Sequence, residues 1–194
     1  MGKRLSEMTL EELWELFPII IREHNPCYKE WYLTEKSEIE KAIDKSIFRR
    51  INHIGSSAVE GLIAKPTVDI LLELDELSDM TEIKQKLVDA GWVVMSYQEE
   101  PEFKMSLNKG YTAEGFAEKV FHLHVRHAGD WSELYFRDYL IDHPDVAKEY
   151  GRLKLQLREQ YLHDRDSYTS EKTEFVMKYS QIAKAEFCNK YLPV

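Results

Sequence analysis

The sequence predicts an α+β protein in which a small mixed β-sheet is flanked by helices and followed by a helical C-terminal half. Three observations predict this class: apolar residues at helical spacing over 9–43, short alternating or continuous apolar segments over 47–125, and helical spacing again from Trp131 onward. A length of 194 residues fits one domain. We divide it into N-terminal helices (1–44), a sheet core (45–127) and C-terminal helices (128–194).

The N-terminal region predicts two helices. Thr9 stands three residues before Glu12, the spacing of a capping box, and apolar residues at helical spacing follow, so the first helix is expected over 9–21. Asn25-Pro26 interrupts the pattern. A second helix is expected over 31–43, and its inward positions are Leu33, Ile39 and Ile43.

The middle region predicts the sheet. Strands are expected over 47–54, 67–74, 92–97, 103–107 and 120–125, with a polar loop that holds Gly110 and Gly115 between the last two. The nearly continuous apolar run at 67–74 is typical of a buried central strand. A helix over 78–90, ended by Gly91, joins the second strand to the third.

The C-terminal region predicts three helices, over 131–141, 146–162 and 168 to about 191. His143-Pro144 separates the first two, and Asp166 or Ser167 caps the last. The expected core positions are Val146, Tyr150, Leu153, Leu157, Tyr161, Phe175, Ile182 and Phe187.

The charge is concentrated in one segment. The chain has 26 Lys and Arg against 35 Asp and Glu, a net of −9, and residues 73–102 alone hold nine acids and two lysines. This acidic run is expected to be a solvated helix face and turn. The balance argues against a nucleic acid partner, which needs a basic face. Residues 45–72 carry a net of +2 and remain compatible with a small anionic ligand.

Cysteine usage and the absence of a long apolar run predict a cytoplasmic protein without a membrane partner. Cys27 and Cys188 show no metal-ligand spacing and are expected to be free thiols of a reducing compartment. The best apolar run near the start, 16–21, is far short of the roughly 18 residues that a membrane span needs.

The stretch from His53 to Leu72 carries the strongest chemical signal. Gly55, Ser56 and Ser57 follow a strand, where a glycine without a Cβ and small hydroxyl donors allow close approach of a phosphate. Asp69, 13 positions after Ser56, stands on a buried strand, where a carboxylate holds Mg²⁺ against the same phosphate. Lys65 would add a positive charge beside the phosphate, and we expect His53 to be a phosphate-binding residue as well.

These residues resemble the signature of the nucleotidyltransferase-fold superfamily, and the chain resembles the GrpB family more closely. The matching motifs are Ile51 to Ile70, Phe121-His-Leu-His-Val125, Phe136-Arg-Asp-Tyr-Leu140, His143-Pro144, Tyr150, Leu153-Lys154, Tyr168 and Lys172. The resemblance implies a nucleotidyltransferase-like fold and a phosphorylated small molecule or nucleotide as ligand. Some GrpB-like domains are joined to dephospho-CoA kinase, which implies a link to coenzyme A metabolism.

The sequence departs from an active transferase at two acid positions, since the second acid of the strand is missing and the strand at 120–125 holds no third acid. Such sites use two acids at alternate positions of one strand, but Leu71 follows Asp69 at that spacing, and the Cα of Glu73 is roughly 13 Å away. His122 and His124 alternate on a strand and are candidates for general-base or metal-ligand roles beside Asp69, with Zn²⁺ or Mn²⁺ favoured over Mg²⁺ alone. Alternatively, these histidines hydrogen-bond Asp69 or backbone carbonyls.

Other candidates have a structural alternative beside the functional one. Arg137 either clamps a phosphate or pairs with Asp138 to fasten the helical half to the sheet. Lys154 and Lys172 are candidates for phosphate binding because of the resemblance. Without it, a lysine on a helix is expected to be solvated. Tyr168 is expected to pack in the core with its hydroxyl at the surface.

Three functional hypotheses remain open. The first is a protein that binds a phosphorylated small molecule and carries out metal-dependent nucleotidyl transfer. The second is a non-catalytic nucleotide-binding or regulatory module, which Leu71 favours. The third is a protein-interaction domain.

Overall fold

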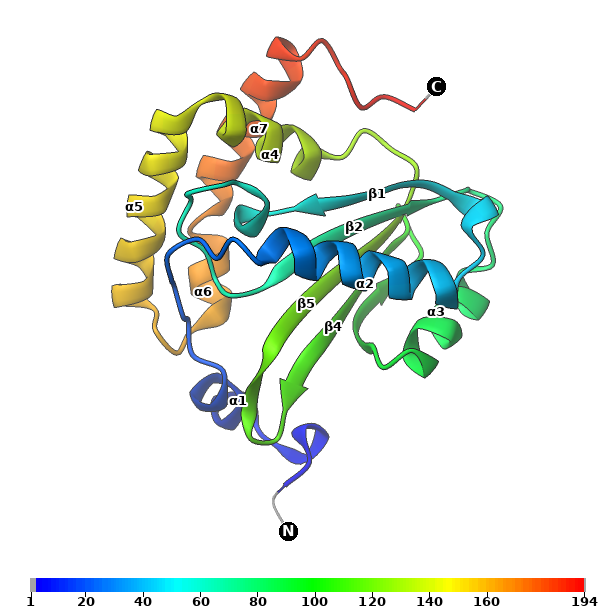
Figure 1. Cartoon of the computed structure of the whole chain (residues 1–194). Coiled ribbons are helices and arrows are strands. Elements are labelled where there is room, and N and C mark those ends of the chain that lie inside the picture. The colour runs from blue at the N-terminus through cyan, green and yellow to red at the C-terminus, as the bar shows by residue number, and fades with distance from the viewer. Residues whose placement is uncertain (1–2, 194) are drawn as a thin grey trace.

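The structure is a computed structural model that describes residues 3–193, in which a five-stranded sheet separates two groups of helices (Figure 1). The strands are β1 (Phe48–Ile54), β2 (Val68–Leu74), β3 (Val93–Gln98), β4 (Lys104–Thr112) and β5 (Gly115–His127). The helices are α1 (Leu10–Leu16), α2 (Tyr28–Ala42), α3 (Met80–Asp89), α4 (Ser132–Asp142), α5 (Pro144–Gln160), α6 (Arg165–Ser170) and α7 (Thr173–Glu186). The predicted α+β class with its helical C-terminal region is confirmed.

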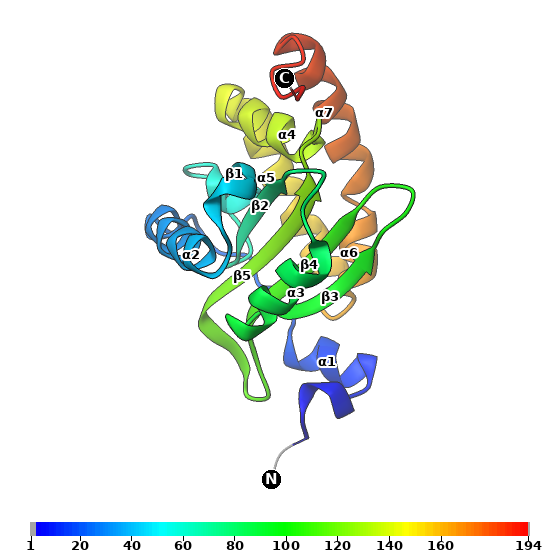
Figure 2. The ribbon, with the colours of Figure 1, turned by 90° about the vertical axis from the view of Figure 1, so that its right-hand side faces the viewer.

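The sheet is mixed, with strand order β1-β2-β5-β4-β3. β2 and β5 are parallel in its centre, and the other neighbouring strands are antiparallel. Figure 2 shows α2 and α7 on opposite sides of β2 and β5. At the left of Figure 1, the carboxyl end of β1 and the amino end of β2 face α5 and α6.

The two faces of the sheet differ in chemistry because side chains alternate along each strand. One face packs against α2 and α3 and forms the main core, with Ile70, Leu72, Leu123 and Val125 fully buried. The other face carries a row of paired residues that runs from Asp69 on β2 to His122 on β5 and Asn108 on β4. This polar row positions the candidate site.

The first helix is shorter than expected. The capping box of Thr9 and Glu12 is present, but α1 ends at Leu16 rather than residue 21. Pro18 removes a backbone donor that a continued helix needs. The following segment runs extended instead, and the Ile19 backbone N–H donates to the Leu162 carbonyl. The expectation of a helix through 21 is therefore wrong.

Other element bounds also shift. β4 and β5 extend into the region expected as a polar loop and leave two residues between Thr112 and Gly115, and Gly110, with φ +91°, lies at the irregularity in their pairing. The expected last helix is divided into α6 and α7, and Asp164 caps α6 in place of Asp166 or Ser167. Leu33 and Ile182, expected in the core, are 52% and 40% exposed.

The acidic run is not wholly solvated. Glu73, its first member, is 0% exposed and lies on β2, where Arg50 of β1 binds both of its carboxylate oxygens at 2.6 and 2.8 Å. Arg50 also donates to the carbonyls of Tyr191 and Gly129. The expectation of a fully solvated face is wrong for Glu73, because its charge is matched inside the protein.

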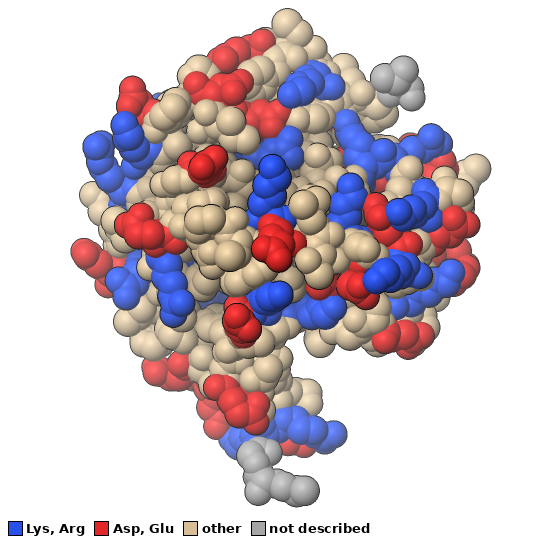
Figure 3. All heavy atoms as spheres, in the orientation of Figure 1, with Lys and Arg blue, Asp and Glu red and all other residues tan. Residues whose placement is uncertain are grey.

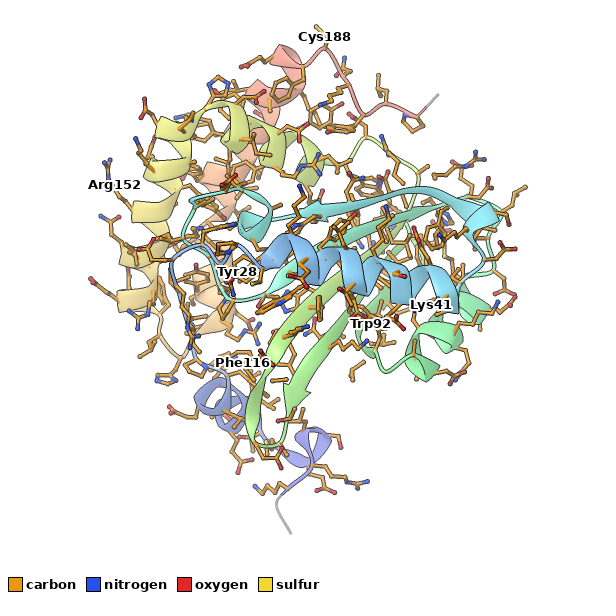
Figure 4. The ribbon with its side chains drawn as sticks, in the orientation of Figure 1. Tyr28, Lys41, Trp92, Phe116, Arg152 and Cys188 are labelled. Carbon is orange, nitrogen blue, oxygen red and sulfur yellow. The ribbon has the colours of Figure 1, made fainter. Side chains whose placement is uncertain are left out.

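The expectation of free thiols is confirmed for both cysteines. Cys27 and Cys188 are free and exposed, and Cys188 lies at the periphery beyond α7 (Figure 4). Within residues 3–193, no helix is both long and apolar enough to cross a membrane.

Candidate functional site

The turn after β1 brings Gly55 against the side chain of Asp69. Gly55 has φ +69°, and a Cβ at this position would lie 2.4 Å from Oδ2 of Asp69. No other residue allows this approach, because both the backbone conformation and the contact require a missing side chain. The Gly55-Ser56 turn and Asp69 therefore form one unit, as the sequence predicts.

Asp69 is the end of a chain of hydrogen bonds. Nδ1 of His122 lies 3.1 Å from Oδ1 of Asp69, and Nε2 of His122 lies 2.7 Å from the Tyr111 hydroxyl. Arg165 donates to that hydroxyl at 3.2 Å. An ionised carboxylate only accepts, so Nδ1–H of His122 donates to Asp69, and Nε2 of His122 shares a hydrogen bond with the Tyr111 hydroxyl. The hydrogen bond between His122 and Asp69 that the sequence analysis names as an alternative is therefore present.

The electrostatics of this chain favour the ionised carboxylate. Burial raises the pKa of Asp69, but the hydrogen bond and charge of His122, together with His124 and His53, outweigh it and hold the pKa below its usual value. Burial lowers the pKa of His124, so this imidazole is neutral near pH 7. His124 lies beside Leu71, one step further along the same face of the sheet.

The donors present do not assemble a metal centre. Within the described chain, no three His, Cys, Asp or Glu side chains come together as ligands for a metal ion. Leu71, at the position where a transferase has its second acid, is 0% exposed and packs with Ile54 and Leu134. Asp69 and His122 are engaged with each other, so Asp69, His122 and His124 do not fit the predicted site for Mg²⁺, Mn²⁺ or Zn²⁺.

Three lysines lie near Asp69, and its carboxylate raises the pKa of each of them against the effect of burial. Lys154 of α5 donates to the Ser56 hydroxyl at 2.9 Å and to the Ile63 carbonyl. Lys65 and Lys172 place their ammonium groups 4.3 and 4.2 Å from the centre of the Tyr168 ring. Arg165 extends this group of cations toward Tyr111, whose ring lies 5.6 Å from its guanidinium. We call Lys65, Lys154, Lys172 and Arg165 the cation cluster.

The cation cluster lacks matching negative charge. Burial, with neighbouring cations, lowers the pKa of Lys65 and of Lys154 to about 7. Burial and Arg165 lower that of Lys172 to about 8, against the opposing effect of Asp69. Asp69 is the carboxylate that acts on all three. No member of the cluster forms an ion pair with a carboxylate among residues 3–193.

Lys154 differs from its neighbours on α5. Its side chain is buried, with 2% exposed, and turns toward the sheet. Arg152, two residues earlier, points away from the molecule (Figure 4). The expectation that Lys154 is by default solvated is therefore wrong, because its amine is held by Ser56 and Ile63.

Tyr168 is also more deeply buried than expected. It is 0% exposed, and its hydroxyl has no hydrogen-bond partner among the described residues. The expectation of a hydroxyl at the surface is wrong, because the whole side chain is buried in a cluster with Ile19 and Leu157. Burial raises the pKa of Tyr168, so the phenol whose ring lies near Lys65 and Lys172 stays neutral.

Three predicted residues lie apart from the cluster. Arg137 donates to Asp138 at 2.6 and 2.8 Å and to the His53 carbonyl at 3.0 Å, so it fastens α4 to β1 rather than reaching toward Asp69. Nε2 of His53 lies 3.0 Å from the Ser57 hydroxyl, and burial lowers the pKa of His53 to about 4. His53, Ser57 and Arg137 line a separate cavity of about 680 Å³.

Tyr111 and Arg165 are functional candidates that the sequence did not indicate. Neither belongs to a recognised motif, and Tyr111 falls in a segment expected as a loop. Knowledge that β4 pairs with β5 would have identified Tyr111, because this pairing brings its side chain to His122. No sequence signal identifies Arg165, which α6 brings to the cluster.

Comparison with known proteins gives consistent results. The family model "GrpB protein" matches residues 18–181. Glutamate-rich protein GrpB of Alkalihalophilus pseudofirmus is 36% identical over 162 residues, which are 81% of this chain and 91% of that protein. UPF0157 protein YqkA of Bacillus subtilis is 28% identical over 93% of this chain and 52% of its own length.

One solved structure has a closely similar fold. The crystal structure of conserved protein GrpB from Enterococcus faecalis covers 87% of this chain and 99% of its own, with a TM-score of 0.75 and 24% identity. The Cid1 poly(U) polymerase is more distant, with a TM-score of 0.43 and 10% identity over 83% of this chain and 51% of its own, which is too weak a likeness to carry an argument. The family model and the relative from Alkalihalophilus pseudofirmus show that the chain belongs to the GrpB family.

Proposed function

We propose that this protein binds a small phosphorylated molecule, of the nucleotide class, at the cation cluster. The observation that supports this proposal is the convergence of three lysines and an arginine on Ser56, Tyr168 and Tyr111 without an ion-pair partner among the described residues. Buried like charges raise the energy of the empty site. A phosphate group supplies the missing negative charge and several acceptor oxygens at once, so it relieves this repulsion.

The shape of the cluster favours a small ligand over a nucleic acid. Lys65, Lys154 and Lys172 come from separate segments and converge on Asp69 and Tyr168. The view in Figure 3 shows acidic and basic side chains interspersed rather than gathered in a broad basic surface. A nucleic acid backbone needs an extended basic face, whereas a few phosphates fit a convergent group of amines.

The same residues favour binding over nucleotidyl transfer. Transfer by two metal ions needs carboxylates that hold both ions about 3.5–4 Å apart. Here Leu71 stands at the position of one of those acids. The ammonium groups of the cation cluster can neutralise phosphates without a metal ion. The proposed function is therefore that of a nucleotide-binding or regulatory module whose binding does not require a divalent metal.

Isothermal titration calorimetry tests this proposal. Tripolyphosphate, ATP and dephospho-coenzyme A are titrated in EDTA and again in Mg²⁺, with the wild type, Lys154→Met and Lys172→Met. The matched controls are Lys148→Met on α5 and Lys178→Met on α7, both of which remove exposed lysines.

We expect binding in EDTA, at least about tenfold weaker in both cluster variants, since charge-assisted hydrogen bonds contribute about 1.5–3 kcal/mol each. The controls are expected to bind like the wild type. Circular dichroism establishes that each variant is folded. If none of the three compounds binds, or if binding appears only with Mg²⁺, the proposed function is wrong.

A further inference from the structure

An apolar groove adjoins the cation cluster. It lies between α1, β3, β4 and α6 and encloses about 590 Å³, within the range of small-molecule sites. Leu10, Trp14 and Phe17 form one wall, and Val93 and Met95 of β3 form the other. Leu10, Val93 and Met95 are 51%, 60% and 61% exposed, an unusual gathering of large apolar side chains at a surface.

The groove and the cation cluster share a wall. Arg165 lines the groove and also belongs to the cluster, where its charge acts on Lys65 and Lys172. Tyr111 lines the groove as well, and its hydroxyl is the link between Arg165 and His122. The cation cluster and the apolar groove thus meet at the side chains of Tyr111 and Arg165.

One row of paired residues in the sheet connects the two regions. Asp69 pairs with His122, His122 with Asn108, and Asn108 with Val93, so one row of side chains crosses from β2 to β3 on the polar face. Three strand spacings of about 4.8 Å give the row a length of roughly 14 Å. A nucleoside triphosphate can span that distance, with its phosphates at one end and its base at the other.

We infer that the groove binds the aromatic body of the ligand while the cation cluster binds its phosphates, so that the substrate class is a nucleoside phosphate rather than inorganic phosphate or polyphosphate. This inference rests on the proposed function. Charge complementarity identifies the ligand class. Its anionic end matches the cation cluster, and its aromatic ring matches the adjoining apolar groove. Polar side chains, among them Asn108 and Thr169, also line the groove, as is usual in small-molecule sites.

The test compares two probes that share a triphosphate and differ in the aromatic body. ATP and tripolyphosphate are titrated calorimetrically with the wild type and with the double variant Leu10→Ser/Met95→Ser, which makes both walls polar without changing the charge. The matched control is Leu33→Ser/Met177→Ser, which replaces the same two residue types at positions 52% and 56% exposed. All four side chains are at the surface, so the variants are expected to fold.

We expect the groove variant to bind ATP roughly tenfold less tightly, the effect of losing the burial of an aromatic group, and to bind tripolyphosphate like the wild type. The control variant should bind both probes unchanged. If tripolyphosphate binds but the groove variant retains full affinity for ATP, the inference is wrong and the proposed function stands. If neither probe binds the wild type, the proposed function itself fails.

A different occupant is detected by sedimentation velocity. If the wild type dimerises as its concentration rises and the groove variant remains monomeric, the groove is a contact between copies of the chain. That result would overturn the inference.

Discussion

Gly55 is the residue on which the geometry of the site depends most strongly. Its backbone is in the left-handed region, and its Cα hydrogen faces the Asp69 carboxylate. A methyl group there meets both a strained conformation and a contact of 2.4 Å with Oδ2. Gly61 has a similar φ of +76° but nothing within 4 Å of a Cβ. A substitution at Gly61 therefore measures the backbone strain without the steric contact.

We expect Gly55→Ala to lower the free energy of unfolding by about 1–3 kcal/mol more than Gly61→Ala, because only the first displaces a neighbour. Urea denaturation of both variants measures the difference. Equal losses in the two variants would show that Gly55 is needed only for its backbone conformation and that Asp69 is not held by this contact.

Residues from one stretch of the chain were easier to predict than residues that meet across it. Gly55, Ser56, Lys65 and Asp69 are close in sequence, and their spacing around two strands predicts that they meet. Arg137 has two plausible roles in the sequence, and the choice depends on Asp138, the His53 carbonyl and the Tyr191 hydroxyl, the last of which follows α7. Sequence spacing contains no information about such a distant partner.

At the scale of elements, one buried ion pair joins the first two strands to the end of the chain. Arg50 of β1 binds Glu73 of β2 and also the carbonyls of Gly129 and Tyr191. The Gly129 backbone N–H donates to Glu73 at 3.2 Å. The pair therefore links β1, β2, the segment after β5 and the segment after α7.

We expect Glu73→Gln to lower the free energy of unfolding by about 2–3 kcal/mol, because it leaves the Arg50 charge without its counterion at a half-buried position. The control is Glu82→Gln, whose partner Lys86 is exposed and whose loss should leave the stability nearly unchanged. Chemical denaturation followed by circular dichroism measures both. Similar small effects in the two variants would mean that the buried pair does not fasten these elements.

Element types were predictable where the apolar pattern was long, and element bounds were not. The continuous run of β2 and the capping box of α1 identified those elements correctly. The end of α1 depends on Pro18 and on a contact between Ile19 and Leu162, and the division of the last helix gives Lys172 its place over Tyr168. Pro18 is a local signal that the sequence contains, whereas the contact of Ile19 with Leu162 and the position of Lys172 are consequences of tertiary packing, which a local pattern does not report.

At the scale of the whole molecule, an acidic protein keeps a basic interior site. The net charge of −9 is carried largely by residues 73–102, whereas Lys65, Lys154 and Lys172 are gathered from the sheet core and the C-terminal helices. The overall charge therefore does not oppose a small anionic ligand. It opposes extended polyanions, whose backbone would also meet the acidic surface.

The cation cluster makes stability depend on pH. The folded pKa values of Lys65, Lys154 and Lys172, about 7 to 8, lie below the unfolded value, so from about pH 7 to 10 the unfolded chain binds more protons. The free energy of unfolding of the ligand-free protein should therefore rise between pH 7 and pH 9. Differential scanning calorimetry in buffers without phosphate measures the melting temperature.

The rise should be smaller in Lys154→Met and unchanged in Lys148→Met, the exposed control on the same helix. Tripolyphosphate at saturation should remove or reverse it, since bound phosphates stabilise the protonated amines that high pH removes. A melting temperature that is flat between pH 7 and pH 9 in the ligand-free wild type would contradict the description of the cluster as crowded and unmatched.

The most direct test of a lysine-based phosphate site is proton uptake on binding. At pH 8, Lys65 and Lys154, with pKa values of about 7, are mostly neutral, and Lys172, with a pKa of about 8, is half protonated. Titration of tripolyphosphate in EDTA, in two buffers of different ionisation enthalpy, counts the protons bound. We predict uptake of roughly one to two protons per tripolyphosphate at pH 8 and less than one at pH 6.5. Binding without proton uptake at pH 8 would contradict the assignment of these lysines as the phosphate-binding groups.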